Sequence, residues 1–193
     1  MARKRGIELE QVVRTASALA DAEGLEAVTL ARVASQLDVR SPSLYSHVDG
    51  LGGLRRALAL DAARRLGTDM AAAAAGREGV DALRAIASAY RSFATTHPGA
   101  YSTILTTPAE DDDAEVYAVF AAQLPPIVAA LEGLGVDPSE AIDVIRAFRS
   151  ALHGFVSLEA SGGFGLPGDL DRSYELMVDL LVDGTLARVQ PLP

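Results

Sequence analysis

Hydrophobic residues recur at steps of three and four along almost the whole chain of 193 residues, and this period is typical of amphipathic α-helices. No segment alternates apolar and polar residues in the manner of a half-buried β-strand. The pattern therefore predicts an all-α fold. The expected helices cover approximately residues 8–23, 30–38, 42–48, 51–66, 79–96, 101–105, 114–133, 138–160 and 171–189.

Capping residues and prolines mark several helix ends. Gly24 is a natural stop for the first helix, and Thr29 is a suitable N-cap for the second. Ser41-Pro42 and Asp137-Pro138 each place a capping side chain before a proline, which is well suited to the first helical position. Pro125-Pro126 falls inside the helix expected at 114–133 and should kink or divide it.

The first three predicted helices are short, and a break of about three residues separates the second from the third. This spacing indicates a helix-turn-helix, in which only the N-terminal turn of the third helix has to reach the base edges of DNA. The expected tip is Ser41, Pro42 and Ser43, and Tyr45 and His47 follow one turn later.

The distribution of charge agrees with a nucleic-acid-binding head. The chain has a net charge of −9, yet residues 1–66 hold ten Lys and Arg against eight Asp and Glu. Residues 67–193 hold seven basic against eighteen acidic residues. The first three charges are Arg3, Lys4 and Arg5, which could form a DNA-contacting arm or simply a solvated end.

Residues 7–66 resemble the DNA-binding head of TetR-type regulators. The segments that carry the resemblance are Gly24-Leu25-Glu26-Ala27-Val28-Thr29-Leu30, Val33-Ala34, Leu37 and Ser41-Pro42-Ser43-Leu44-Tyr45-Ser46-His47-Val48. Two positions depart from the family pattern. Asp38 stands where the family often has a turn glycine, and Leu51 stands where it often has a phosphate-binding lysine.

The resemblance implies a role in DNA binding for ten residues. Thr29 would hold a phosphate, and Tyr45 and His47 would contact the DNA backbone. Packing of the Tyr45 ring between helices is the alternative, while Leu44 and Val48 should be core residues. The basic arm would reach phosphates or the minor groove. The full predicted set is Arg3, Lys4, Arg5, Thr29, Arg40, Ser41, Pro42, Ser43, Tyr45 and His47, of which residues 40–43 would face bases.

The helix expected at 138–160 is apolar on two faces, and so must be covered on two sides. We expect the chain's own body on one side and a second copy on the other, with the last helix joining a four-helix interface. The alternative is that both faces serve one monomer core. The predicted interface residues are Ala147, Ala151, Gly154, Leu158, Tyr174, Met177, Val178 and Leu181.

The C-terminal part also resembles one subgroup of these regulators, the WHG type. The motif that carries this resemblance is Arg149-Ser150-Ala151-Leu152-His153-Gly154-Phe155, Leu158-Glu159, Gly162-Gly163-Phe164-Gly165, Asp171 and Ser173. We also expect a sensor pocket among the converging helices of the body, and its apolar lining implies an apolar or amphipathic effector, although core packing is the alternative for most of its walls. The predicted wall residues are Tyr90, Phe93, Tyr101, Leu105, Phe120, Leu124, Phe148 and His153.

Other classes of protein find little support in the sequence. The chain has no cysteine and only three histidines, and we expect no cofactor, no metal site and no catalytic residues. His153 and Glu159 are six residues apart and so lie off each other's helix face. No apolar run of about 20 residues and no signal-peptide core occurs, which favours a cytoplasmic protein.

The sequence therefore predicts three parts: a helix-turn-helix DNA-binding domain at 1–50, a linking helix at 51–66, and a helical-bundle ligand-binding and dimerisation domain at 67–193. The expected function is a transcriptional regulator, released as a homodimer from a palindromic operator by a small molecule. The alternatives are an all-helical carrier or enzyme whose head no longer binds DNA, and a structural dimer module. Activation in place of repression also remains open.

Overall fold

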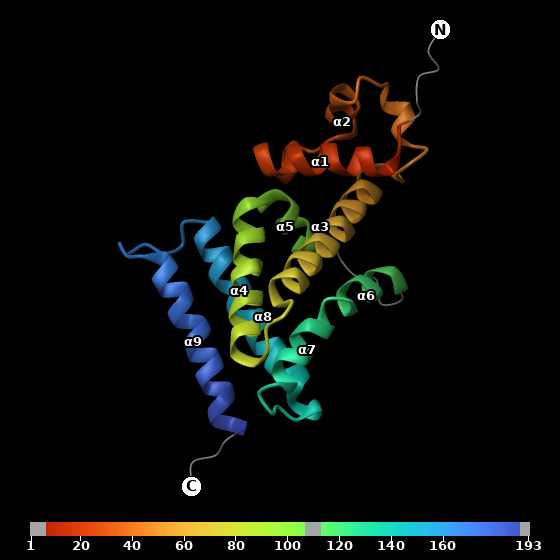
Figure 1. The fold of residues 1–193 in the computed structure, drawn as a ribbon. Coiled ribbons are helices and arrows are strands. Elements are labelled where there is room, and N and C mark those ends of the chain that lie inside the picture. Colours follow the sequence, from red (N-terminus) through yellow and green to blue (C-terminus); the bar gives the residue numbers. More distant parts are fainter. Residues whose placement is uncertain (1–6, 107–112, 190–193) are drawn as a thin grey trace. The chain divides into compact units, whose positions relative to one another are not determined.

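The computed structural model describes residues 7–106 and 113–189, and within these residues every regular element is a helix (Figure 1), as the sequence predicts. The α-helices are α1 (Leu9–Glu23), α2 (Leu30–Gln36), α3 (Gly50–Ala74), α4 (Gly79–Thr96), α5 (Pro98–Thr106), α6 (Ala114–Ala121), α7 (Leu124–Glu132), α8 (Pro138–Ala160) and α9 (Leu170–Val189). Two short 3₁₀ helices are η1 (Leu25–Ala27) and η2 (Ser41–Leu44).

The chain folds into two compact units that are each assembled from separate stretches of sequence. The first unit combines the residues up to Arg65 with Thr96–Val119, and the second combines Leu66–Thr95 with the residues from Phe120 onward. The head and most of the linking helix predicted at 51–66 therefore fall in the first unit. The first unit also includes α5, which helical periodicity alone could not assign to it.

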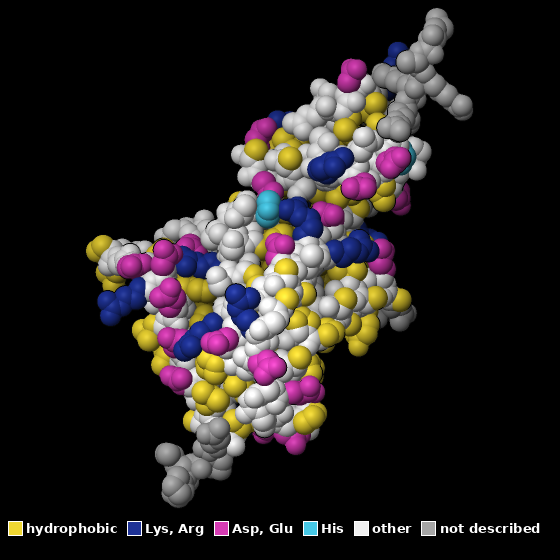
Figure 2. All heavy atoms as spheres, in the orientation of Figure 1, with side chains coloured by type: hydrophobic (Ala, Val, Ile, Leu, Met, Phe, Trp, Pro, Cys, Tyr) yellow, Lys and Arg dark blue, Asp and Glu magenta, His cyan; other side chains and the backbone are white. Residues whose placement is uncertain are grey.

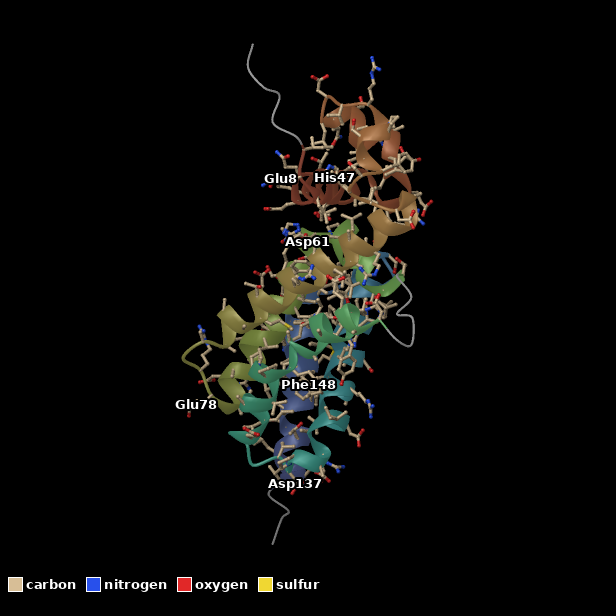
Figure 3. The ribbon with its side chains drawn as sticks, turned by 90° about the vertical axis from the view of Figure 1, so that its right-hand side faces the viewer. Glu8, His47, Asp61, Glu78, Asp137 and Phe148 are labelled. Carbon is tan, nitrogen blue, oxygen red and sulfur yellow. The ribbon has the colours of Figure 1, made fainter. Side chains whose placement is uncertain are left out.

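The core of the first unit is formed by α1, α2, η2 and the beginning of α3. Glu8 starts α1 through a capping box in which its backbone N–H donates to Gln11 Oε1 at 3.0 Å (Figure 3). Leu44 is fully buried and Val48 nearly so, which confirms both as core residues. The buried residues of this cluster are Val12, Val13, Ala16, Leu19, Ala20, Val28, Val33, Ala34, Leu44, Val48, Leu54 and Leu58.

Helix α5 completes the first unit by packing its N-terminus against the end of α1. The Asp21 carboxylate accepts a hydrogen bond from the Ala100 N–H at 2.8 Å, and its other oxygen lies 3.0 Å from His97 Nδ1. An acidic side chain at a helix N-terminus is favoured, because it satisfies N–H groups that lack partners within the helix.

The second unit is built around α4, α8 and α9. Asp137 caps α8 by accepting a hydrogen bond from the Ser139 N–H at 2.8 Å, as its position before a proline predicts. Phe148 lies near the middle of the same helix (Figure 3). The buried residues that these three helices contribute include Leu83, Ile86, Tyr90, Phe93, Ile145, Phe148, Leu152, Phe155, Tyr174, Val178 and Val182.

Two local predictions need correction, and one is confirmed. The helix expected at 42–48 is the 3₁₀ helix η2 followed by a turn, because so short a segment closes through i to i+3 hydrogen bonds. Helix α3 begins at Gly50 and continues to Ala74, so the helix expected at 51–66 extends eight residues further than predicted. The prediction for Pro125-Pro126 is confirmed, because the stretch expected at 114–133 is divided into α6 and α7 and both prolines lie in the first turn of α7.

One segment of the described residues, Ala114–Glu132, is long and apolar enough to cross a membrane by length and composition. It is not one uninterrupted helix, however, because α6 ends at Ala121 and α7 begins at Leu124. This break gives the segment two short helices in place of one span.

Candidate nucleic-acid interface

Residues 40–47, which we call the reading segment, place polar side chains at the surface around one buried residue. Arg40, Pro42, Ser43 and Tyr45 are exposed, whereas Leu44 between them is fully buried in the core of the first unit. The Tyr45 side chain is 61% exposed, so its ring is not packed between helices as one interpretation of the sequence suggested. Leu44 thus fixes the backbone from which its neighbours project.

Ser41 and His47 complete the segment. Both are half-buried, and His47 lies on the turn that follows η2 (Figure 3). The His47 N–H donates to the Leu44 carbonyl at 2.9 Å, and the Ser46 hydroxyl donates to the Ser43 carbonyl at 2.9 Å. These local bonds hold the segment in a defined shape before any ligand binds.

The turn between α2 and η2 is a Schellman motif with Asp38 at the position that usually carries glycine. Asp38 has a φ of 52°, in the left-handed region. Among the described residues, no other residue except glycine has a positive φ. The Val39 N–H donates to the Ala34 carbonyl at 3.0 Å, and the Asp38 N–H donates to Ser35 at 3.2 Å. The sequence therefore located the strained residue of the turn correctly.

Thr29 caps α2, as its position predicts. Its Oγ1 accepts a hydrogen bond from the Arg32 N–H at 3.2 Å, and its own O–H can still donate to an incoming phosphate. The Arg32 guanidinium donates to both carboxylate oxygens of Glu23, at 2.9 and 2.6 Å. This bidentate bond holds the pKa of Glu23 below its usual range.

Most arginines of the first unit are engaged by carboxylates. Arg56 pairs with Asp113 at 2.7 Å and with Glu115 at 2.9 Å, and these bonds lower the pKa of both acids. Arg64 pairs with Glu115 at 2.8 Å. Arg40, by contrast, carries no ion pair among the residues that the structure describes, so its charge remains available beside the reading segment.

Two other predictions concern the edges of this surface. Arg3, Lys4 and Arg5 lie outside the described residues. Leu51, which replaces the phosphate-binding lysine of the family, is partly buried against the core of the first unit. Its side chain therefore contributes packing.

The residues predicted for a dimer interface divide into exposed and buried groups. Ala147 and Leu158 are exposed, while Ala151, Gly154, Met177 and Leu181 are half-buried. Tyr174 and Val178 are instead 4% exposed and belong to the core of the second unit. The Tyr174 hydroxyl donates to the Ala87 carbonyl at 2.6 Å, so this side chain is directed into its own unit.

The residues predicted for an effector pocket fall in both units. Tyr90, Phe93 and Phe148 are buried in the second unit, Phe120, Leu124 and His153 are half-buried there, and His153 Nδ1 lies 3.3 Å from Ser157 Oγ. Tyr101 is buried in the first unit, where Leu105 is 43% exposed. Phe148 also borders a cavity of about 380 Å³ between α8 and α9.

An arginine that the sequence did not single out organises the C-terminal motif. Arg91 on α4 donates to both oxygens of Glu159, at 2.9 and 2.6 Å, and pairs with Asp171 at 2.8 Å. Its guanidinium carbon lies 4.9 Å from the centroid of the Tyr174 ring and 5.6 Å from that of Phe155. Phe155 in turn packs against Phe164, with 4.7 Å between the ring centroids and 45° between the ring planes. The Leu-Glu and Gly-Gly-Phe-Gly elements of the motif therefore converge on Arg91.

The head with its exposed reading segment, together with a separate helical body, defines a helix-turn-helix transcriptional regulator. Residues 83–181 match the family described as "Tetracyclin repressor-like, C-terminal domain". The chain belongs to this TetR family of regulators.

Two curated relatives agree with this assignment. The HTH-type transcriptional regulator Rv0681 of Mycobacterium tuberculosis is 39% identical over 162 residues, which are 84% of this chain and 74% of the relative. The HTH-type regulator YobS of Bacillus subtilis is 32% identical and covers 96% of both chains. Among solved structures, the regulatory protein SCO4313 is 27% identical, with a TM-score of 0.74 over 91% of this chain and 95% of its own.

Proposed function

We propose that this regulator is a repressor that binds a palindromic operator as a homodimer and is released by a small molecule. The observation that carries the proposal is the reading segment, in which exposed polar residues surround the buried Leu44. Arg40, which has no ion pair with any residue that the structure describes, lies at the N-cap of η2. Repression is favoured because the matched family is described as repressor-like. We propose the same functional division of the chain as the sequence predicts: a DNA-binding domain at 1–50, a linking helix at 51–66 and a ligand-binding and dimerisation body at 67–193.

The exposed side chains of the reading segment suit the major groove of DNA. Arg40 can donate two hydrogen bonds to a guanine edge or bind a phosphate, and Ser43 can donate to either. Tyr45 and the Thr29 hydroxyl are placed to donate to phosphates, which would fix the register of the head. In a dimer, two such heads would read half-sites about 34–36 Å apart.

The surface of α8 and α9 supports a dimer through these helices. A Cβ atom at Gly154 would meet nothing within 4 Å, so no contact within the described chain requires glycine there. A close-packed partner helix would require it. We revise the interface by omitting Tyr174 and Val178, which are buried, and by adding Leu176 and Leu180, which are 59% and 64% exposed. The cavity of about 380 Å³ beside Leu180 and Gly184 offers room for a partner side chain.

The effector we propose is apolar or amphipathic, because aromatic and aliphatic side chains dominate the predicted wall residues. It could release DNA only through different affinities for the binding and non-binding conformations. Membership of the WHG-type subgroup is part of this proposal, and the convergence of its motif on Arg91 supports it.

The test is binding to fragments of the chain's own upstream DNA at several salt concentrations. We expect selective binding that weakens with salt, because phosphate contacts release counterions. Arg40→Ala should weaken binding at least tenfold, and if Arg40 contacts phosphate the salt slope should fall by about 2 per dimer. Arg77→Ala, which removes an exposed arginine in the second unit, is the matched control.

Loss of affinity in Arg77→Ala equal to that in Arg40→Ala would contradict the assignment of the reading segment. Failure to select any sequence from a genome-wide library, by a folded protein, would contradict the proposed function as a whole.

A further inference from the structure

A groove of about 640 Å³ runs between α4 and α9 in the second unit, and charged side chains line it. Figure 2 shows basic and acidic side chains next to each other over this part of the surface. The residues that matter for its chemistry are Arg84, Ser88 and Arg91 on α4, and Asp171, Glu175 and Asp179 on α9.

Two ion pairs cross the groove. Arg84 pairs with Asp179 at 2.9 Å, and Arg91 pairs with Asp171 at 2.8 Å. Because the residue number rises along α4 while it falls along α9, the two helices run antiparallel here. Glu175 is four residues from each aspartate, and Ser88 is four and three residues from the two arginines, so these two residues occupy the level between the ion pairs.

The middle level therefore has an anion without a cation. Among the described residues, Glu175 carries no ion pair, and its side chain is exposed to the groove. The two arginines of the groove are already bound by other carboxylates and do not compensate the charge of Glu175. Arg91 is already bound by Glu159 and Asp171, and Arg84 donates through two nitrogens to Asp179 at 3.0 and 2.9 Å.

The local balance of charge is negative. Three carboxylates (Asp171, Glu175 and Asp179) and two guanidinium groups line the groove, and one of these guanidinium groups, that of Arg91, is also bound by Glu159. A cation entering the groove gains from this field, and an anion is repelled. The volume is in the range of small-molecule sites, which hold about 300–1,000 Å³.

We propose that the α4–α9 groove binds an organic ammonium ion at the level of Glu175. The ammonium group donates hydrogen bonds to the Glu175 carboxylate and to the Ser88 hydroxyl. It thereby supplies Glu175 with the cation that Arg84 and Arg91 supply to the two aspartates. The hydrocarbon part lies toward Tyr174 and Val178, which form the apolar floor of the groove. This site is independent of the apolar effector pocket and of the proposed DNA binding.

The test uses the purified full-length protein and 2-phenylethylammonium as the probe, with uncharged 2-phenylethanol as its isostere. Titration followed by calorimetry or ligand-observed NMR at low ionic strength should show saturable binding of the amine only. Equal binding of the alcohol would overturn the proposal, because the site would then recognise apolar surface. Absence of amine binding would overturn it as well.

Variants locate the binding. Glu175→Gln keeps the size of the side chain and should weaken amine binding at least tenfold. Ser88→Arg should place a guanidinium group beside Glu175 and form a third ion pair across the groove, which would abolish amine binding and raise the Tm. Asp183→Asn removes one exposed charge two turns later on α9, outside the groove, and should change the affinity less than twofold. Equal losses in Glu175→Gln and Asp183→Asn would reduce the effect to general attraction by an acidic protein and would overturn the site.

Discussion

Gly99 lies so close to the backbone of Ala20 that a Cβ atom at Gly99 would fall 2.1 Å from both the carbonyl carbon and the carbonyl oxygen of Ala20. The atoms it would meet are main-chain atoms of α1, which cannot rotate away as a side chain could. The hydrogen bond from the Ala100 N–H to Asp21 adds a polar contact at the same place. The contact between α1 and α5 thus depends on the absence of one methyl group.

Replacement of Gly99 by alanine should therefore separate α5 from α1. We expect the free energy of unfolding to fall by about 3 kcal/mol or more, since the clash can be relieved only by backbone movement. Urea denaturation measures the loss. Gly52→Ala in α3 is the control, because a Cβ there meets nothing within 4 Å and alanine favours a helix by about 0.5–1 kcal/mol. Equal stability of the two variants would contradict this close contact.

The left-handed Asp38 should tolerate substitution according to backbone preference. Asp38→Gly is expected to change the stability by less than about 1 kcal/mol, because glycine adopts positive φ freely but gains entropy in the unfolded chain. Asp38→Val should destabilise by about 2 kcal/mol, since β-branched residues are strained at this φ. Thermal unfolding of both variants checks the order, and a valine variant as stable as the glycine variant would be inconsistent with a Schellman turn here.

The pair of Arg91 and Glu159 should make stability depend on pH in the acid range. The hydrogen bonds from Arg91 hold the pKa of Glu159 below its usual range, so the folded protein binds this proton less readily than the unfolded chain does. The stabilisation is then complete above the unfolded pKa, about 4.3, and is lost as the pH falls through the lower folded value.

Glu159→Gln should accordingly lower the stability by about 2 kcal/mol at pH 7, and the difference from the natural protein should shrink below about pH 4. Urea midpoints between pH 7 and pH 3 provide the measurement. Glu132→Gln, at an exposed position on α7, should show little difference at any pH. A difference between Glu159→Gln and the natural protein that grows as the pH falls would have the wrong sign for this pair.

The proposed dimer predicts that a charge on the exposed apolar face of α9 prevents association. Leu180→Arg should shift the protein from dimer to monomer in light scattering, because a cation would be buried opposite its own copy. Leu166→Arg, in the loop before α9 and 86% exposed, should leave the dimer intact. A protein that is monomeric without substitution, or a dimer unaffected by Leu180→Arg, would require a different interface.

The sequence predicted best those features that depend on neighbouring residues. The caps at Thr29 and Asp137 and the turn at Asp38 each arise within a few residues, so their side-chain chemistry was sufficient. Arg91 was missed because its partner Glu159 is 68 residues away, and only the packing of α4 beside α8 brings them together. An arginine directly after Tyr90, beside an apolar helix face, was the available signal. Tyr174 and Val178 were assigned to the partner's side for a similar reason, since periodicity finds apolar faces but not which neighbour covers them.

The discontinuity of the first unit bears on how the protein is made. Leu9–Arg65 emerge from the ribosome well before α5 does. At synthesis rates of about 5–20 residues per second, the surface of α1 that contacts Gly99 therefore stays uncovered for about 2–7 s. The DNA-reading part is therefore finished only after α4, a helix of the other unit, has also left the ribosome. A nascent chain stopped before Pro98 carries the reading segment but lacks the helix that packs against α1, so the first unit cannot be completed in such a chain.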